Sequence, residues 1–145
     1  MRFSGAVIAL ATTLFACSGP NMMPAWSIDI VPSYSSEAEQ VAAIAHDIGL
    51  VPRDVPPASL DFGGGRKEKR LQVWEWPSHA ATSLGLFQNE QTQNYHIILE
   101  DSQSGGLELV GESCAKYLDL VRAMKARFGA ARLRFYKETC DPGRQ

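Results

Sequence analysis

The side chains of clearest chemical interest in this sequence are two cysteines near its carboxyl end, Cys114 and Cys140. Residues 114–128 carry apolar side chains at helical spacing, Gly129 is placed to end that helix, and residues 132–140 alternate like a strand. Such a helix rises about 21 Å, and such a strand returns about 26 Å. The strand therefore brings Cys140 back to the level of Cys114, and the sequence predicts a disulfide bond between them.

The residue types that carry out catalysis do not form a recognisable set in this sequence. Its three histidines, His46, His79 and His96, are far apart, and no serine stands in a glycine-flanked elbow. No HExxH motif appears, and no histidine or third thiol near the two cysteines completes a metal set. Acidic residues at 100–101 and at 138 and 141 are interpreted as solvated strand ends. We therefore expect no catalytic residue, metal or cofactor, and an enzyme is the least favoured interpretation.

The charge balance argues against nucleic acid as a partner. Lys and Arg number 14, and Asp and Glu number 16, so the net charge is only −2. The run Gly63-Gly64-Gly65 before a basic segment at 66–70 suggests a phosphate loop, which needs a strand before it and a helix after it. Here a proline-rich segment precedes the run and a predicted strand follows. We interpret it as a solvated turn whose cations could contact anionic headgroups.

The amino terminus is organised as an export signal. A positive Met1-Arg2 end precedes an apolar run, Ala6 to Phe15, that is too short to span a bilayer. The ending Leu14-Phe15-Ala16-Cys17 resembles the lipobox of bacterial lipoproteins, in which an aliphatic residue, a small residue, and Ala or Gly precede the lipidated cysteine. This resemblance covers the export signal alone. It implies that residues 1–16 are removed and that Cys17 receives acyl chains, palmitate among them, which anchor the protein in a membrane.

Ser18 follows that cysteine where an acidic residue would favour the inner membrane, so we expect an outer-membrane lipoprotein facing the periplasm. Ordinary signal cleavage, leaving a soluble periplasmic protein, is the alternative. Lipidation also accounts for the cysteine count, because three cysteines in an oxidising compartment leave one thiol over. With Cys17 acylated, Cys114 and Cys140 remain as a pair, and their loop would contribute about 3 kcal/mol in the chain-entropy model. Two unpaired buried thiols are the alternative.

The rest of the chain is expected to form one globular domain over residues 26–145, joined to the lipidated cysteine by a tether over 17–25. Apolar periodicity predicts a helix after Ser36, which begins a capping box with Glu39, and the helix over 114–128. Strands are predicted over 71–76, 82–88, 94–100 and 132–140, with 107–110 either a short strand or the approach to the final helix. Residues 26–31 are either a strand or an extended linker, and 51–62, with three prolines, are a loop.

This order of elements predicts an α+β fold, a two-layer sandwich of two helices on a mostly antiparallel sheet of four to six strands. If residues 26–31 form a strand, the order contains two β-α-β units around an extra strand, which is loosely ferredoxin-like.

The second face of that sheet is the candidate binding surface. If Leu71, Val73, Tyr95, Ile97, Leu99, Leu133 and Phe135 face the helices, their neighbours must face the other way. Those neighbours have the composition of protein interfaces and hot spots. They are the predicted partner-binding residues Trp74, Trp76, His96, Ile98, Arg134 and Tyr136, with Gln72 beside them. Folding of residues 18–34 or of the 51–62 loop over this face, or a bulge that turns one strand, are the alternatives.

Three functions follow, in decreasing order of support. The first is a lipid-anchored periplasmic protein-binding module, either an inhibitor or immunity-type protein or an accessory of envelope machinery. The second is an envelope lipoprotein that uses the same aromatic face to bind a glycan or a lipid, with Trp74 and Trp76 stacking on sugar rings. The third is an enzyme of unrecognised type.

Overall fold

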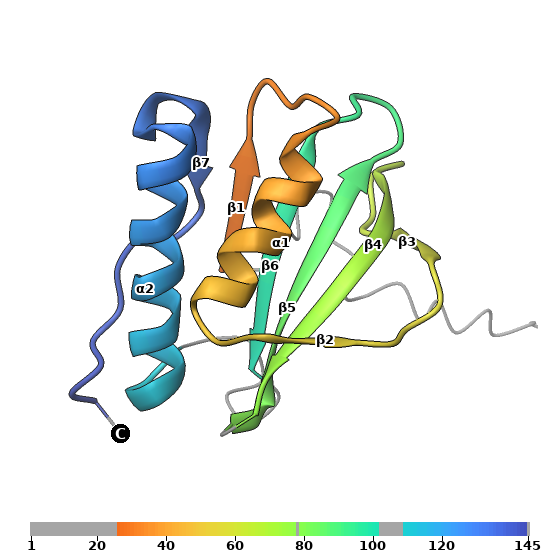
Figure 1. The fold of residues 1–145 in the computed structure, drawn as a ribbon. Helices are drawn as coiled ribbons and strands as arrows, with labels where there is room; N and C mark the ends of the chain where they lie inside the picture. Colours follow the sequence, from red (N-terminus) through yellow and green to blue (C-terminus); the bar gives the residue numbers. More distant parts are fainter. Residues whose placement is uncertain (1–25, 78, 102–108, 145) are drawn as a thin grey trace, which may run out of the picture.

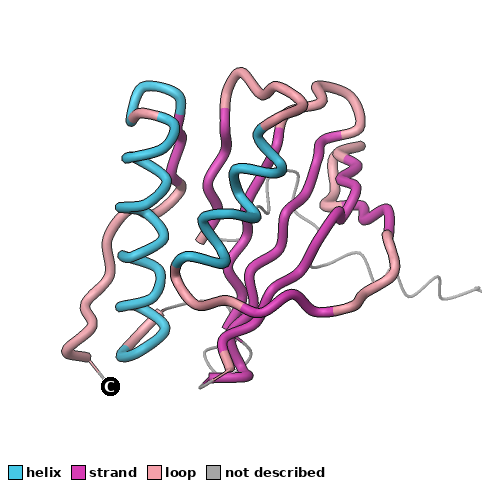
Figure 2. The backbone as a smooth tube through the Cα atoms, in the orientation of Figure 1, coloured by secondary structure: helices cyan, strands magenta, loops and turns pink. Residues whose placement is uncertain are grey.

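The structure, a computed structural model, describes residues 26–77, 79–101 and 109–144. The predicted export signal, Cys17 and the tether lie outside the described residues. Figure 2 marks the helices and strands along the backbone. Their order is β1 (Ser27–Ile30), α1 (Glu37–Asp47), β2 (Val51–Arg53), β3 (Ala58–Asp61), β4 (Lys67–Trp76), β5 (His79–Asn89), β6 (Tyr95–Asp101), α2 (Gly111–Phe128), the 3-10 turn η1 (Ala130–Arg132) and β7 (Leu133–Phe135).

The strands form one sheet in the order β2-β4-β5-β6-β1-β7, and β3 pairs with β4 along the same edge as β2. All of these strand pairs are antiparallel. Both α-helices lie on one face of the sheet (Figure 1). The described residues therefore form a two-layer α+β sandwich, and the predicted fold class is confirmed. The ferredoxin-like order is not confirmed, because α1 leads into three strands at the far edge of the sheet.

The strand predictions hold best in the middle of the sheet. Residues 26–31 do contain a strand, β1, and the strands predicted over 82–88 and 94–100 correspond to β5 and β6. The predicted loop over 51–62 contains β2 and β3, which the prolines concealed; Pro52 is tolerated because β2 is an edge strand. At the other edge, the strand predicted over 132–140 ends at Phe135.

The two helices begin and end largely where local chemistry predicts. Helix α2 ends at Phe128, and Gly129 follows with φ 80°, in the region that favours glycine. At the start of α1 the predicted capping box is absent, because the Ser36 side chain makes no capping hydrogen bond. Glu37 takes that place: its Oε2 accepts a hydrogen bond from the backbone N–H of Tyr34 at 2.6 Å.

The core fills the space between the helices and the sheet face that they cover. Trp26, at the start of β1, packs edge-on against Tyr117 of α2, with ring centroids 5.1 Å apart. The fully buried apolar side chains come from both helices and from the central strands, and include Val41, Leu120, Met124, Ile28, Ile30, Leu84, Ile97 and Leu99. Burial of this apolar surface is the main stabilising contribution to the fold.

Candidate functional site

Trp74 and Trp76 lie in the core, so the prediction that they face away from the helices is wrong. Trp74 is 2% exposed and Trp76 is 1% exposed, and both belong to the apolar cluster beneath the helices. Trp74 lies opposite Leu84, which lies opposite Leu99 on the next strand, so the three side chains share the helix-covered face.

A bulge in β4 is the physical reason for this difference. The register passes from Arg70 opposite Phe87 to Gln72 opposite Leu86, so β4 carries one extra residue at Leu71. Without the bulge, strict alternation would place Trp74 on the same face as Arg70. A second irregularity lies between Glu75 and Trp76. The sequence pattern alone does not locate either one.

His96 and Ile98 do lie on the face away from the helices, but both are buried. His96 pairs across the sheet with Phe87, and Ile98 pairs with Gly85. The ring of Phe87 lies over Gly85, where an added Cβ would come within 2.5 Å of the Phe87 Cε2 atom. His96 is 5% exposed and Ile98 is 1% exposed. Neither side chain is therefore directly available to a partner.

His96 instead lies at the centre of a group of five residues that we call the polar cluster: Asp29, Arg66, Glu68, Asn89 and His96. The Nδ1 atom of His96 is hydrogen-bonded to Asp29 Oδ1, and its Nε2 atom lies 3.5 Å from Glu68 Oε1. The same Glu68 oxygen accepts hydrogen bonds from Arg66 Nε at 2.7 Å and from Asn89 Nδ2 at 3.2 Å. The cluster thus ties β1, β4, β5 and β6 together on this face.

The charges of the polar cluster explain why it can be buried. Its two carboxylates face the imidazole ring and one guanidinium, and buried carboxylates are tolerated where such donors pair with them. Arg66 Nη2 also lies 3.2 and 3.3 Å from the two ring nitrogens of His96. Both ring nitrogens therefore have partners, whereas a general base needs a nitrogen within reach of a substrate. The geometry suits a network that holds Arg66 in place better than one that transfers protons.

Arg66 connects this buried network to the surface. Burial lowers the pKa of Arg66, but hydrogen bonds to Glu68 and Tyr136 and the attraction of both groups outweigh burial, and the pKa is raised overall. Its side chain is 28% exposed, whereas that of Glu68 is fully buried. The network therefore presents a fixed cation beside Tyr136.

Arg134 and Tyr136 are the two predicted site residues that the structure leaves exposed. Arg134 lies opposite Asp29 in the β1–β7 pair, and the backbone N–H of Tyr136 donates to Ser27 O at 3.2 Å. Tyr136 is 49% exposed, and its side chain lies close enough to Arg66 to help raise the pKa of that guanidinium. We call Arg66, Arg134 and Tyr136 the Tyr136 patch.

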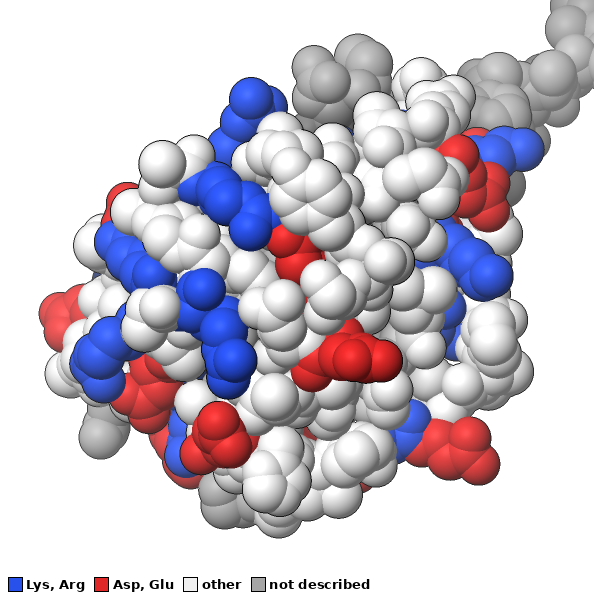
Figure 3. All heavy atoms as spheres, turned by 45° about the horizontal axis from the view of Figure 1, so that its top comes forward, with Lys and Arg blue, Asp and Glu red and all other residues white. Residues whose placement is uncertain are grey.

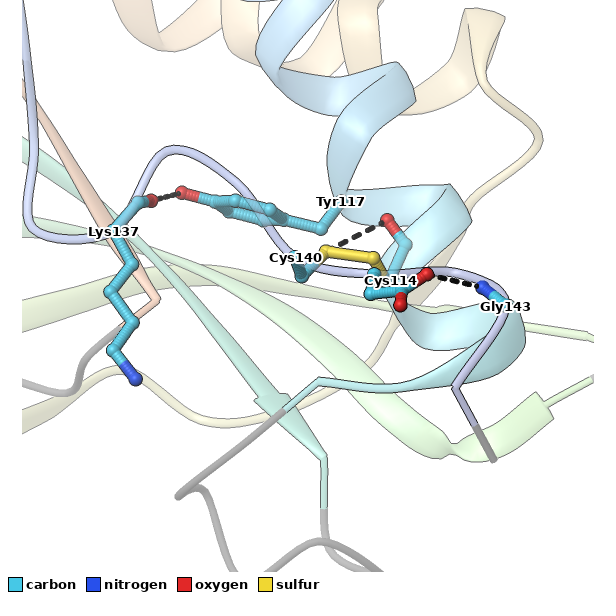
Figure 4. The surroundings of a disulfide bond; sticks show 6 residues. Cys114, Tyr117, Lys137, Cys140 and Gly143 are labelled. Carbon is cyan, nitrogen blue, oxygen red and sulfur yellow. Dashed lines mark hydrogen bonds between the residues drawn. A yellow bond between two sulfur atoms is a disulfide. The ribbon is translucent and has the colours of Figure 1, made fainter.

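Residues 136–144, which begin with Tyr136, run back along α2 (Figure 1). We call this segment the carboxyl-terminal strap. The disulfide bond between Cys114 and Cys140 is present, with an S–S distance of 2.01 Å. Figure 4 shows it beside the hydrogen bond that the hydroxyl of Tyr117 donates to Lys137 O. The N–H of Gly111 donates to Arg144 O at 2.9 Å. The disulfide bond and these two hydrogen bonds therefore attach the strap to the first turns of α2.

Sequence reasoning missed four residues of the polar cluster: Asp29, Arg66, Glu68 and Asn89. Asp29 did carry a signal, because it is a charged residue in the middle of an otherwise apolar strand pattern. Glu68 and Arg66 carried none, since they belong to a segment that reads as a charged, solvated turn.

A shallow hollow between the end of α1 and the side of α2 is lined by Asp47, Gly49, Asp119, Arg122, Ala123 and neighbouring side chains. Its mixed charge and open shape do not define a ligand. In the described ranges no three His, Cys, Asp or Glu side chains are grouped to hold a metal ion. No helix within those ranges is long and apolar enough to cross a membrane.

Comparison with known proteins identifies no relative of this chain. The chain matches no family model, and no curated protein and no solved structure is significantly similar to it.

Proposed function

We propose that this protein is a lipid-anchored, periplasmic protein-binding module that contacts its partner through the Tyr136 patch. Its role would be that of an inhibitor or immunity-type protein, or of an accessory to envelope machinery. The observation that supports this proposal is an exposed tyrosine near Arg66, whose guanidinium is held by buried carboxylate and imidazole groups, with the exposed Arg134 two residues before that tyrosine. Tyrosine and arginine are enriched among the residues that dominate binding energy at protein interfaces.

Preorganisation strengthens this interpretation. Binding costs free energy for each side chain that becomes ordered, so a side chain held in place beforehand binds more favourably. Arg66 is held by Glu68 and His96, and the backbone of Tyr136 is held by its hydrogen bond to Ser27 O, with the Tyr136 side chain near Arg66. Binding at the Tyr136 patch should therefore cost little free energy for ordering its side chains.

The glycan- or lipid-binding alternative loses its main support. It relied on Trp74 and Trp76 as stacking platforms, and both rings are buried in the core. Tyr136 alone would remain for stacking on a sugar.

The proposed location rests on the lipobox-like ending at Cys17. We expect Cys17→Ser to release a folded protein from the membrane, because acyl chains supply the attachment. Fractionation of salt-washed membranes measures this. A Cys17→Ser protein that stays with the membranes would exclude the lipid anchor.

Site-specific photo-crosslinking of the full chain in bacterial cells tests the binding function. A photoreactive phenylalanine analogue replaces Tyr136 in one strain and Val51, on the edge strand β2, in another. The two positions are comparably exposed, at 49% and 47%, so they form a matched pair. We expect one discrete protein adduct from position 136 and none from position 51, as read by mass spectrometry. Equal adducts from both positions, or none from position 136, would refute the proposal.

A further inference from the structure

The segment that carries Arg134 and Tyr136, two of the three residues of the Tyr136 patch, is strongly basic. Residues 116–137 contain seven Lys or Arg residues and one acidic residue, Asp119, a net charge of +6 in a chain whose total is −2. The remainder of the chain is therefore acidic. Opposite charges separated in this way create a directed surface potential.

The fold gathers this charge at one edge of the molecule. The last turns of α2, η1, β7 and the start of the carboxyl-terminal strap are neighbours there (Figure 1). Figure 3 shows Lys and Arg side chains, in blue, gathered at the left of the view, the side on which α2 and β7 lie. We call this surface the basic edge; it comprises Lys125, Arg127, Arg132, Arg134 and Lys137.

Part of this charge is neutralised within the fold, and part is not. Lys125 is paired with Glu138, and Arg132 is paired with Glu37. Among the described residues, no carboxylate oxygen lies within 4 Å of Arg127 or Arg134. A cation in the last turn of α2, such as Arg127, complements the helix dipole. That reason does not extend to Arg134, which lies in the edge strand.

Lys137 follows Tyr136 in the chain. Its Nζ atom lies over the Trp26 ring, 5.1 Å from the ring centroid. The basic edge is continuous with the Tyr136 patch, because Arg134 belongs to both. A partner that covers Tyr136 therefore also meets exposed cations.

We propose that the partner bound at the Tyr136 patch is a protein with an acidic surface, whose carboxylates face the basic edge. This inference rests on the proposed function and names the chemistry of the partner. Arginine guanidinium groups match carboxylates in a planar, two-point geometry, and Arg is favoured over Lys at interfaces. Three of the five residues of the basic edge are arginines. Charge complementarity of this kind accelerates association and selects among partners.

An anionic membrane is the other surface that could attract this charge, and the positions of the acidic residues disfavour it. Glu138 is paired with Lys125 of the basic edge, and an oxygen of Asp119 lies 3.1 Å from Arg122 Nη1 on α2. A membrane of one charge sign would repel both carboxylates. A protein surface can place a cation opposite each of them.

The test uses the full chain purified in a non-ionic detergent, with two probes: fluorescein-labelled poly-L-glutamate and vesicles containing phosphatidylglycerol. The test variant is Arg127→Glu/Arg134→Glu. The matched control is Lys67→Glu/Lys69→Glu on β4, which changes the net charge by the same amount at two exposed positions away from the basic edge. The milder Arg127→Gln/Arg134→Gln guards against misfolding, because a glutamate at 134 would lie opposite Asp29. Thermal melts confirm that each variant is folded.

We expect fluorescence anisotropy to show poly-L-glutamate binding that the Glu variant weakens on the order of tenfold and the Gln variant weakens less, while the control leaves it unchanged. Raising NaCl from about 0.1 M to about 1 M, which shortens the screening length from about 10 Å to about 3 Å, should abolish it. Equal losses in the test and control variants would overturn the inference. Vesicle binding that depends on Arg127 and Arg134, without poly-L-glutamate binding, would also overturn it and indicate a membrane surface.

The two proposals fail separately. A photo-crosslinked adduct from position 136 that survives the Arg127→Glu/Arg134→Glu change would leave the binding module intact and refute the acidic partner.

Discussion

Both faces of the central sheet carry buried side chains, but different interactions stabilise them. Beneath the helices, Trp74, Leu84 and Leu99 form an apolar surface whose burial is favourable in any close-packed arrangement. On the other face, the polar cluster of Asp29, Arg66, Glu68, Asn89 and His96 depends on distances of a few ångströms between specific atoms. The apolar face defines the fold, whereas the polar face holds exposed groups in a fixed arrangement. The proposed binding surface lies on the second face, because Arg66 belongs both to the polar cluster and to the Tyr136 patch.

The largest effect is expected from breaking the apolar face. Trp76→Ala should lower the free energy of unfolding by about 3–5 kcal/mol, because it leaves a cavity where a fully buried indole was. Urea denaturation measures this. The exposed Tyr136→Ala serves as the comparison and should stay within about 0.5 kcal/mol of wild type. A small loss for Trp76→Ala would mean that the ring is accessible after all.

The next largest effect is expected from breaking the disulfide bond that joins the carboxyl-terminal strap to α2. Cys114→Ala/Cys140→Ala should cost about 3 kcal/mol, because the bond closes a loop over a sequence separation of 26 residues. Thermal melts without reductant measure the loss. Wild type in excess reductant should match the variant. A wild-type melt that reductant does not change would argue against the bond.

A smaller effect should follow from breaking the polar face. Asp29→Ala removes the acceptor of a hydrogen bond to the buried His96 ring and should cost about 1–3 kcal/mol. Asp29→Asn keeps an acceptor oxygen and should cost less. Denaturation of both variants under identical conditions gives the comparison. Equal losses would indicate that the carboxylate charge, and not the hydrogen bond, is what the cluster requires.

The smallest stability effect, and one with a pH signature, is expected at Tyr117. Burial, helped by nearby Glu138, raises the pKa of its hydroxyl above the ordinary 10.0. The folded protein therefore keeps this proton where the unfolded chain loses it, so stability falls as the pH rises above about 10. Tyr117→Phe should cost about 1 kcal/mol at neutral pH, from the lost hydrogen bond to Lys137 O, and its deficit should shrink at high pH. A deficit independent of pH up to about 11 would contradict the raised pKa.

The sequence predicted most of the helices and strands correctly, but it did not predict which residues form the polar cluster and the Tyr136 patch. Periodicity located α2, because the stripe that includes Cys114, Tyr117 and Met124 recurs at helical spacing and is buried. It assigned β6 and β7 to the correct faces, with Ile97 and Leu133 inward. It placed the tryptophans of β4 on the wrong face, because the extra residue at Leu71 reverses the alternation. Of the predicted partner-binding residues, only Arg134 and Tyr136 lie on an accessible surface.

What the sequence determined by itself is the local and pairwise part of this protein: the two helices, most of the sheet, and a cysteine pair that a helix and the segment returning along it bring together. These follow from periods of 3.6 and 2 and from chain dimensions, which neighbouring residues suffice to specify. Only the tertiary structure decided that Asp29, Glu68 and Arg66 meet around His96 and that Arg66 reaches Tyr136. These residues come from β1, β6, the start of β4 and the residue after β7, which are far apart in the sequence. One inserted residue in β4 determines which of its side chains share a face.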